Sequence, residues 1–497
     1  MTNSGFVGNT TFTHQFEWYR TQSRIKETSL QVITLNTRPD LLALAQHNPK
    51  RYPALFQSLG QGLSEPKLNS SLQAHAQWDL LGIASGEQVV ADGKKDKSFF
   101  AALESALKKV AAPKNATIEN TPPFLGGWVV YLGYELSDEI EPHLQLPATQ
   151  FEFPRAFALR TPGVIAVHRD TGVALLIFEP GFDALFGAVQ LDLTLDLSAI
   201  THEPITAKIK EDAPTRFLSA TERVHDYLRA GDVFQANISR GWRAKLDLAV
   251  SNAQIYANLC AANPAPFAAL VQFDDFAIIS SSPERLVQSQ NGWVQTRPIA
   301  GTRARQLGDL PLTAQEKSAF VGDIKERAEH IMLIDLERND LGRVCEAGSI
   351  VVDELLTVES YTHVHHIVSN VAGRLRAGVG PIELLKAVFP GGTITGCPKV
   401  RCMEIIAELE RTGRGPYTGA LGYIGHNGDM DFNILIRTFA RVKNTLHFRA
   451  GAGIVMDSIA EKELLETRAK AKGMLGALLL IKRKLKADER YCAVSCS

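Results

Sequence analysis

Two pairs of glutamates occur in segments that have the residue pattern of helices. KERAEH carries Glu326 and Glu329, and KELLET carries Glu463 and Glu466. Residues three apart lie on one face of a helix, so the two carboxylates of each pair point the same way. Such acids are also typical of solvated helix faces, but both segments continue into apolar runs, where inward carboxylates need a compensating cation. Hard oxygen ligands suit Mg²⁺, and no cluster of cysteines and histidines indicates zinc.

Glycines and a basic residue elsewhere indicate an anionic substrate. AGAGIV contains Gly451 and Gly453, whose backbone N–H groups can approach a carboxylate closely because no side chain intervenes. Arg437 in ILIRTF is either a bidentate carboxylate donor at the end of an apolar strand or half of a structural ion pair. PGGTITGCPK lacks the G-x-x-x-x-G-K-[ST] spacing, which excludes a P-loop nucleotide site in this segment.

Composition narrows the class of protein. The chain has 497 residues, of which 45% are hydrophobic and 22% charged, as expected for a soluble globular protein with a large core. A net charge of −1 gives no global attraction to nucleic acid or to an acidic membrane, and no apolar run is long enough to span a bilayer. The first residues lack a signal-peptide pattern, and six scattered cysteines suit a reducing compartment. We expect a cytoplasmic protein with neither nucleic-acid nor membrane partners.

The order of the elements predicts the fold class. Apolar runs flank Asp170-Thr171-Gly172 within 163–179 and Asp274-Asp275 within 267–281, which predicts two hairpins. Helices are expected from a capping box at Ser219 to Gly231, over 312–340 and over 461–485. Strands and helices mix without a short βαβ repeat, which favours an α+β (complex α/β) fold of large antiparallel sheets with helices outside. A polar stretch at 196–215 is the expected boundary between two parts.

Several longer motifs resemble those of the chorismate-utilising enzymes. They are DIKERAEHIMLIDLERNDLGRV, YTHVHHIVSNVAG, PGGTITGCPKVRCMEIIAELE, GPYTGALGYIG and EKELLETRAKA. The resemblance covers about 215–480, is weak at 120–180 and is nearly absent before 110. It implies an anthranilate-synthase-type β-sandwich core of large antiparallel sheets with helices outside. An N-terminal subdomain, 1–205, would pack on a chorismate-binding catalytic domain, 215–485.

The resemblance also implies roles for individual residues. Glu329 and Glu466 resemble direct Mg²⁺ ligands, with Glu326 and Glu463 completing the site. The residues that resemble substrate-binding groups are Tyr417, Arg437, Gly451, Gly453 and Lys470. The residues that resemble groups near the leaving hydroxyl are the acid/base Glu284 and the ring-side His366 and Thr393. A separate glutamine amidotransferase subunit is the implied source of ammonia, because no glutaminase nucleophile elbow is visible in the chain.

The reaction within this family depends on position 300. Ala300 lies in PIAGT, where the best-known aminodeoxychorismate synthases carry a lysine that attacks the substrate and anthranilate synthases carry alanine. Pro298 and Gly301 are expected to shape a loop that brings residue 300 to the ring.

Other segments resemble the aminodeoxychorismate branch instead, namely GDVFQANIS with Asn237, NPAPFAAL, SPER and VHHIVS. We therefore interpret the chain as an Mg²⁺-dependent aminodeoxychorismate synthase component I that makes 4-amino-4-deoxychorismate for 4-aminobenzoate and folate biosynthesis. Anthranilate synthase component I is the alternative that Ala300 favours. A non-catalytic protein on the same scaffold would be expected to lose one of the glutamates.

Overall fold

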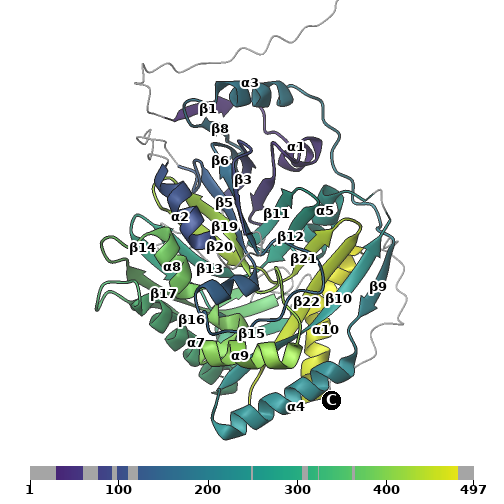
Figure 1. Ribbon diagram of the computed structural model, residues 1–497, viewed down its shortest axis with the longest axis vertical. Helices are drawn as coiled ribbons and strands as arrows, with labels where there is room; N and C mark the ends of the chain where they lie inside the picture. Colours follow the sequence, from purple (N-terminus) through teal and green to yellow (C-terminus); the bar gives the residue numbers. More distant parts are fainter. Residues whose placement is uncertain are drawn as a thin grey trace, which may run out of the picture.

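Two large antiparallel sheets form the centre of the molecule. The computed structural model describes residues 30–59, 77–91, 98–109, 121–247, 250–304, 312–322, 324–360 and 364–478. Within these residues every strand pairing is antiparallel. Figure 1 shows the strands running through the middle of the molecule, with helices around them.

The first sheet contains twelve strands in the described part of the chain. Its order is β1 (Gln31–Leu35), β8 (Ala174–Phe178), β7 (Gly163–His168), β3 (Trp78–Ile83), β2 (Ala54–Gln57), β11 (Phe267–Phe273), β12 (Phe276–Ser282), β21 (Thr438–Val442), β22 (Thr445–Ile454), β10 (Gln235–Leu246) and β18 (Gly396–Cys397), with β9 (Ala207–Glu211) also paired to β10. The two expected hairpins are confirmed as β7–β8 and β11–β12. Gly172 and Asp274 in their turns both have positive φ, of 73° and 47°.

The second sheet contains ten strands, again counting described residues. Its order is β15 (Ile299–Ala304), β17 (Val364–Arg374), β14 (Trp293–Thr296), β13 (Arg285–Gln290), β20 (Met430–Ile434), β19 (Ala420–Gly425), β5 (Gly127–Leu132), β6 (Ala156–Thr161) and β4 (Gln88–Val90), with β16 (Val351–Ser360) also paired to β17. Both sheets take strands from 1–205 and from 215–485, so the two predicted parts share each sheet. The boundary between them stays a prediction.

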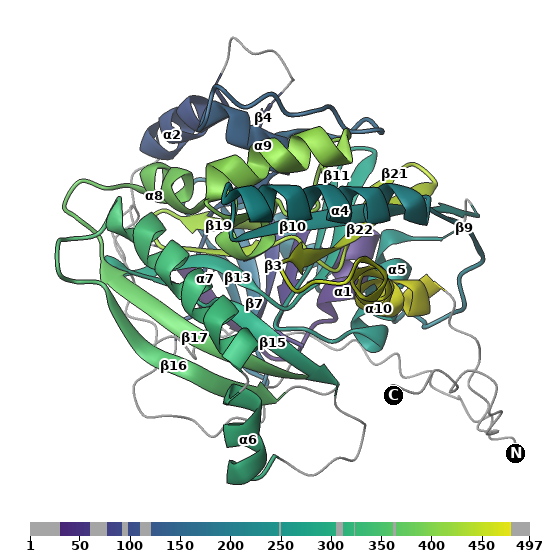
Figure 2. The same ribbon diagram turned by 90° about the horizontal axis from the view of Figure 1, so that it is seen from below.

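Helices lie outside the sheets. They are α1 (Leu41–His47), α2 (Phe99–Lys109), α3 (Asp183–Asp192), α4 (Pro214–Ala230), α5 (Asn252–Ala262), α6 (Ala314–Val321), α7 (Ile324–Gly342), α8 (Pro381–Val388), α9 (Lys399–Glu410) and α10 (Ala460–Leu478), with short 3₁₀ turns η2 (Tyr134–Glu139) and η3 (Gly392–Ile394). Figure 2 shows α4 and α9 running along one side of the molecule, and α7 crossing β15 and β17 on another. Among the described residues, no helix has the length and apolar character needed to cross a bilayer.

Two helix predictions need correction. The expected capping box is wrong, because Ser219 and Glu222 lie inside α4, which begins at Pro214 and ends as predicted at a left-handed Gly231. Proline at the first helical position lacks an N–H that would need a partner, so the helix starts there without a side-chain cap. The single helix expected over 312–340 is two helices, α6 and α7, which separate around Gly322. The described part of the last helix ends at Leu478.

The sheets face each other across a shared apolar layer. Val129 and Phe157 of the second sheet pack with Val271 and Ile278 of the first. The rings of Phe157 and Phe273 stack with centroids 4.6 Å apart. Strands such as β5 and β7 are buried along their whole length because each sheet is covered on both faces, which explains their continuous apolar sequences. The predicted β-sandwich core with helices outside is therefore confirmed.

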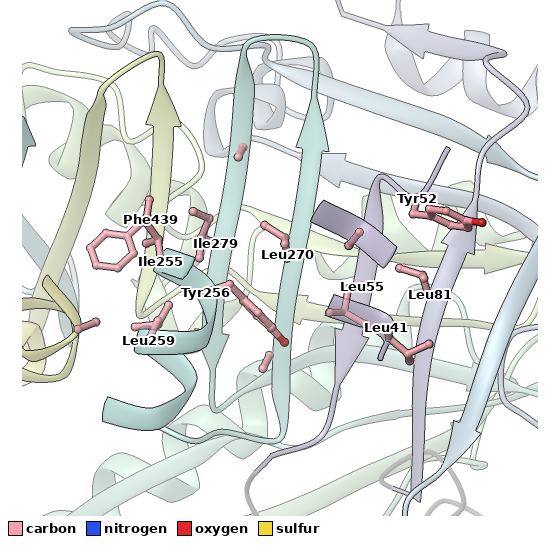
Figure 3. Packing of buried hydrophobic residues seen from close by; sticks show 14 of the residues in the cluster. Leu41, Tyr52, Leu55, Leu81, Ile255, Tyr256, Leu259, Leu270, Ile279 and Phe439 are labelled. Atoms are coloured by element: carbon pink, nitrogen blue, oxygen red, sulfur yellow. The ribbon is translucent and has the colours of Figure 1, made fainter. Parts of the chain in front are cut away.

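A second apolar layer lies between the first sheet and its helices. Figure 3 shows Ile255 and Leu259 of α5 packed beside Leu270, Ile279 and Phe439 of the sheet. Full burial of each such side chain contributes about 1.5–3 kcal/mol. The matching layer on the other sheet includes buried residues of α2 and α8. These layers hold the strand ends, and the side chains on them, in fixed positions.

A buried charge cluster joins the two sheets. Arg160 on β6 of the second sheet donates to Glu179, which directly follows β8 of the first, with Nη1 and Oε1 2.9 Å apart. His426, after β19, contacts the same carboxylate. Arg160 and Glu179 are only 2% and 6% exposed. Neither charge has access to water, so each depends on the other.

We expect Glu179→Gln to lower the free energy of unfolding by about 3 kcal/mol, because it leaves the Arg160 guanidinium buried without a counter-charge. Urea unfolding measures this change. Glu222→Gln, at an exposed position of α4, is the control and should change stability by less than about 0.5 kcal/mol. Equal stability of the two variants would contradict this assignment.

Candidate active site

Residues of both sheets and of α10 lie close together in one region. Gly451 and Gly453 lie on β22, and Lys470 lies on α10, which packs against that strand. The Lys470 Nζ donates to the Gly451 carbonyl at 3.1 Å and pairs with Glu466 Oε1 at 2.6 Å. This pair of contacts joins the C-terminal helix to the glycine strand.

Tyr417 and Asn237 both reach the glycine strand. A Cβ atom added at Gly451 would lie 2.7 Å from the Tyr417 hydroxyl and 2.7 Å from Asn237 Oδ1. Glycine is therefore required where these two polar groups approach the backbone. The Asn237 Oδ1 is buried and has no hydrogen-bond partner in the described structure. A buried polar atom without a partner costs free energy, which a bound ligand with a donor would recover.

Arg437 is a half-buried cation without an ion-pair partner among the described residues. It follows β20 in a left-handed conformation, with φ of 53°. Its guanidinium makes no hydrogen bond or ion pair with any residue that the structure describes. Burial lowers the pKa of Arg437, and the nearby Tyr417 and Glu466 counteract part of that effect. The sequence left open a structural ion pair for Arg437. No such pair is found among the described residues, so the guanidinium is available to a carboxylate.

Glu284 is a buried acid at the β12–β13 junction. It is 6% exposed, and its Oε1 has no hydrogen-bond partner among the described residues. Burial raises the pKa of Glu284 to about 7, although the Thr393 hydroxyl, the Ile299 N–H and the charge of Lys470 each lower it. The Thr393 Oγ1, in the η3 turn, is also buried. No described residue lies in hydrogen-bond geometry with it. Glu284 therefore exchanges a proton close to neutral pH, as a general acid requires.

His366 lies on β17 and is 8% exposed. Burial lowers the pKa of His366 to about 4, and the charge of Arg437 lowers it further. The imidazole is therefore neutral at physiological pH and lies within the electrostatic reach of Arg437. This proximity connects the second sheet to the residues around Gly451.

The segment around Ala300 is a strand with a bulge. Ala300 pairs with Ile367 and Thr302 pairs with His366, so Gly301 is the extra residue between them. Gly301 has φ of 63°, and a Cβ there would lie 2.9 Å from Glu326 Oε2. The expected loop is therefore wrong, because the backbone continues pairing with β17 on both sides of Gly301. The side chain of Ala300 lies outside the described residues.

The four glutamates lie on the two helices that border this region. Glu326 and Glu329 are half-buried on α7, Glu463 is half-buried on α10, and Glu466 is exposed beside Lys470. No group of three or more histidine, cysteine, aspartate or glutamate side chains is close enough to hold a metal in the part of the chain that the structure describes. Mg²⁺ commonly uses only one or two protein carboxylates, with water and substrate oxygens as its other ligands. The chemistry of these donors therefore fits Mg²⁺.

The structure also brings in residues that the sequence did not single out. Glu337 on α7 is 6% exposed and close enough to Glu284 for that carboxylate to raise its pKa. The buried Thr296 hydroxyl is close enough to Glu337 to lower the pKa of its carboxyl. The sequence signal was weak, because Glu337 lies in IDLERND among charged residues that are typical of a solvated face.

Comparison with known proteins places the chain in a family. The sequence profile described as chorismate binding enzyme matches residues 67–476. An anthranilate synthase component I-like protein of Synechocystis sp. is 42% identical over 72% of this chain and 73% of its own length. The aminodeoxychorismate synthase component 1 of Bacillus subtilis is 41% identical over 73% of this chain and 79% of its own length. The chain therefore belongs to the chorismate-binding enzymes.

A solved structure supports the same assignment. The anthranilate synthase component I of Streptococcus pneumoniae superposes with a TM-score of 0.69 at 30% identity, covering 83% of this chain and 95% of that chain. The protein is thus a chorismate-utilising enzyme with the fold of that structure. The match to the family begins at residue 67, nearer the N-terminus than the motifs alone indicated. Relatives of both branches match at similar identity, so identity alone does not separate the two reactions.

Proposed function

We propose that the chain is component I of an aminodeoxychorismate synthase, which converts chorismate and ammonia to 4-amino-4-deoxychorismate and water. The observation that carries the proposal is the placement of Asn237. This residue distinguishes the aminodeoxychorismate-type segment from its anthranilate counterpart, and its open Oδ1 lies against Gly451 and the Tyr417 hydroxyl. The sequence difference between the branches therefore lies among the residues that would hold the substrate.

Substrate binding follows from the charges of the site. Arg437 would bind a chorismate carboxylate with its planar guanidinium, and the Tyr417 hydroxyl would donate to the same group. Gly451 and Gly453 let the polar ends of Tyr417, Asn237 and Gln235 approach the backbone of β22, and these groups would contact the substrate there. Arg437 is half-buried, so water screens this attraction less than it would screen a fully exposed pair.

The leaving group is the C4 hydroxyl of chorismate. Hydroxide leaves poorly, so the neutral Glu284 carboxyl would donate its proton as the C–O bond breaks, releasing water. Neutral His366 and the Thr393 hydroxyl would lie beside the ring and orient it. Ammonia would form the new bond at C4, and the ammonium group so formed would release one proton to solvent to become the amine. No amine side chain is present at position 300 to form a covalent adduct. A separate glutamine amidotransferase subunit would supply the ammonia.

The metal belongs to the proposal as well. Glu329 and Glu466 would bind Mg²⁺, with Glu326 and Glu463 completing the site. When bound, Mg²⁺ would hold the ring carboxylate and withdraw electron density from the ring. Glu466 would then exchange its contact with Lys470 for the metal.

Anthranilate synthesis is the second candidate, which the alanine at position 300 favours. The same binding groups and the same acid would serve that reaction. Only the carbon that ammonia attacks, and the later loss of pyruvate, would differ.

Product analysis separates the two candidates. The protein is incubated with chorismate, Mg²⁺ and an ammonium salt. Anthranilate is followed by fluorescence, and a parallel sample receives a pyridoxal-phosphate lyase that releases 4-aminobenzoate. We expect 4-aminobenzoate only when the lyase is present. Ala300→Lys should retain or raise this activity, because the lysine would add a covalent route to the same product. Formation of anthranilate alone by the unmodified protein would contradict the proposal.

We also expect kcat to fall as the pH rises above about 7, because Glu284 acts in its protonated form and burial raises the pKa of its carboxyl to about 7. The acid stays protonated below that pH and loses its proton above it. Chorismate consumption measured across pH at saturating substrate tests this expectation. A kcat that stays constant from pH 6 to 9 would exclude Glu284 as the acid.

A further inference from the structure

The α7 helix places a second buried carboxyl behind Glu284. Glu337 faces the η3 turn, where its Oε1 lies 3.5 Å from the position that a Cβ at Gly392 would occupy. The same added Cβ would lie 2.4 Å from Leu336 Cδ2, so only glycine lets the turn approach the helix this closely. Gly392 directly precedes Thr393, whose hydroxyl adjoins Glu284. One glycine therefore brings the buried acid of α7 next to the turn that borders the reacting group.

Charged and polar groups face Glu337 from each neighbouring element. Asp340, one turn further along α7, is ion-paired with Lys399 of α9, whose Nζ also donates to the Val388 carbonyl at 3.1 Å. Thr296, at the end of β14, presents a hydroxyl, and Glu284 is near enough for its charge to act on Glu337. Lys399 is already bound to Asp340, so Glu337 lacks an ion-pair partner of its own in the described structure.

These surroundings keep a proton on Glu337. Burial raises the pKa of Glu337 well above its usual range, and the charges of Asp340 and Glu284 raise it further, whereas Lys399 and Thr296 lower it less. The charge of Glu284 thus favours the protonated form of Glu337. When Glu284 has given up its proton, Glu337 still holds one.

We propose that Glu337 is a positioning residue that returns a proton to Glu284 after each turnover. The inference rests on one part of the proposed function, namely that Glu284 protonates the leaving hydroxyl. In the first transfer, the Glu284 O–H bond breaks and water leaves from C4 of chorismate. In the second, the Glu337 proton passes to the Glu284 carboxylate, which leaves Glu337 ionised. A proton from solvent then restores Glu337, so the two carboxyls end the cycle as they began.

The test compares one turnover with many. Glu337→Gln keeps the size of the side chain but removes its acidic proton. Chorismate consumption is followed by absorbance below the pKa of Glu284, with Mg²⁺ and ammonium present, first with enzyme in excess and then with substrate in excess. We expect a single-turnover rate equal to that of the unmodified protein and a kcat about tenfold lower, because only repeated turnovers need the returned proton. Glu337→Asp, which retains a carboxyl, should recover most of the lost kcat.

Controls separate this effect from a general loss of structure. Asp335→Asn alters an exposed acid on the same helix, which pairs with Arg338, and should leave both rates unchanged. The midpoint temperature of thermal unfolding is measured for Glu337→Gln and for the unmodified protein. Equal midpoints would show that the variant retains the fold. An equal fall in both rates would assign Glu337 a structural function, and an unchanged kcat would mean that no proton is returned through it. Either result overturns the inference, while formation of 4-amino-4-deoxychorismate by the unmodified protein upholds the proposed function. Absence of chorismate turnover by the unmodified protein overturns both.

Discussion

The site depends on a guanidinium that is partly withdrawn from water and has no ion-pair partner among the described residues. Arg437 lies in a left-handed backbone position after β20 and makes no ion pair among the described residues. An isolated buried charge is costly, so the packed sheets around it must supply the free energy that keeps it in place. A carboxylate that enters the site recovers that cost as binding energy. The two apolar layers of the sandwich thus hold a cation in place although its guanidinium forms no ion pair with the described acids, of which Glu466 is near enough to act on its pKa.

The acid chemistry follows from the same exclusion of water. Glu284 keeps a proton near neutral pH because burial outweighs the hydrogen bonds and the lysine charge that favour its ionised form. His366 remains neutral because burial and the positive charge of Arg437 both disfavour the protonated imidazolium form. One desolvated region therefore contains a fixed cation, a protonated acid and a neutral imidazole. This combination suits a dianionic substrate that must lose a hydroxyl group.

Local sequence signals predicted the fold where a single physical requirement dominates. The hairpins were predictable because Gly172 and Asp274 mark turns that need positive φ, and the longer motifs within 323–425 and 461–471 identified the family. The capping box at Ser219 failed because Pro214 starts the helix a turn earlier. Glu337 escaped notice because its burial depends on Gly392, which is far away in sequence and comes close only in the folded chain. A contact of this kind between distant parts of the chain produces no periodic pattern in the sequence around Glu337 or around Gly392.

The most direct measurement is the affinity for chorismate of the unmodified protein and of Arg437→Gln, determined by calorimetry. Arg441→Gln is the control, because this nearby arginine is already hydrogen-bonded to Asn252. We expect Arg437→Gln to weaken binding by at least about tenfold, as for loss of a charged hydrogen bond, while the control binds normally. Unchanged affinity in Arg437→Gln would contradict the account that the half-buried, unpaired guanidinium holds the substrate.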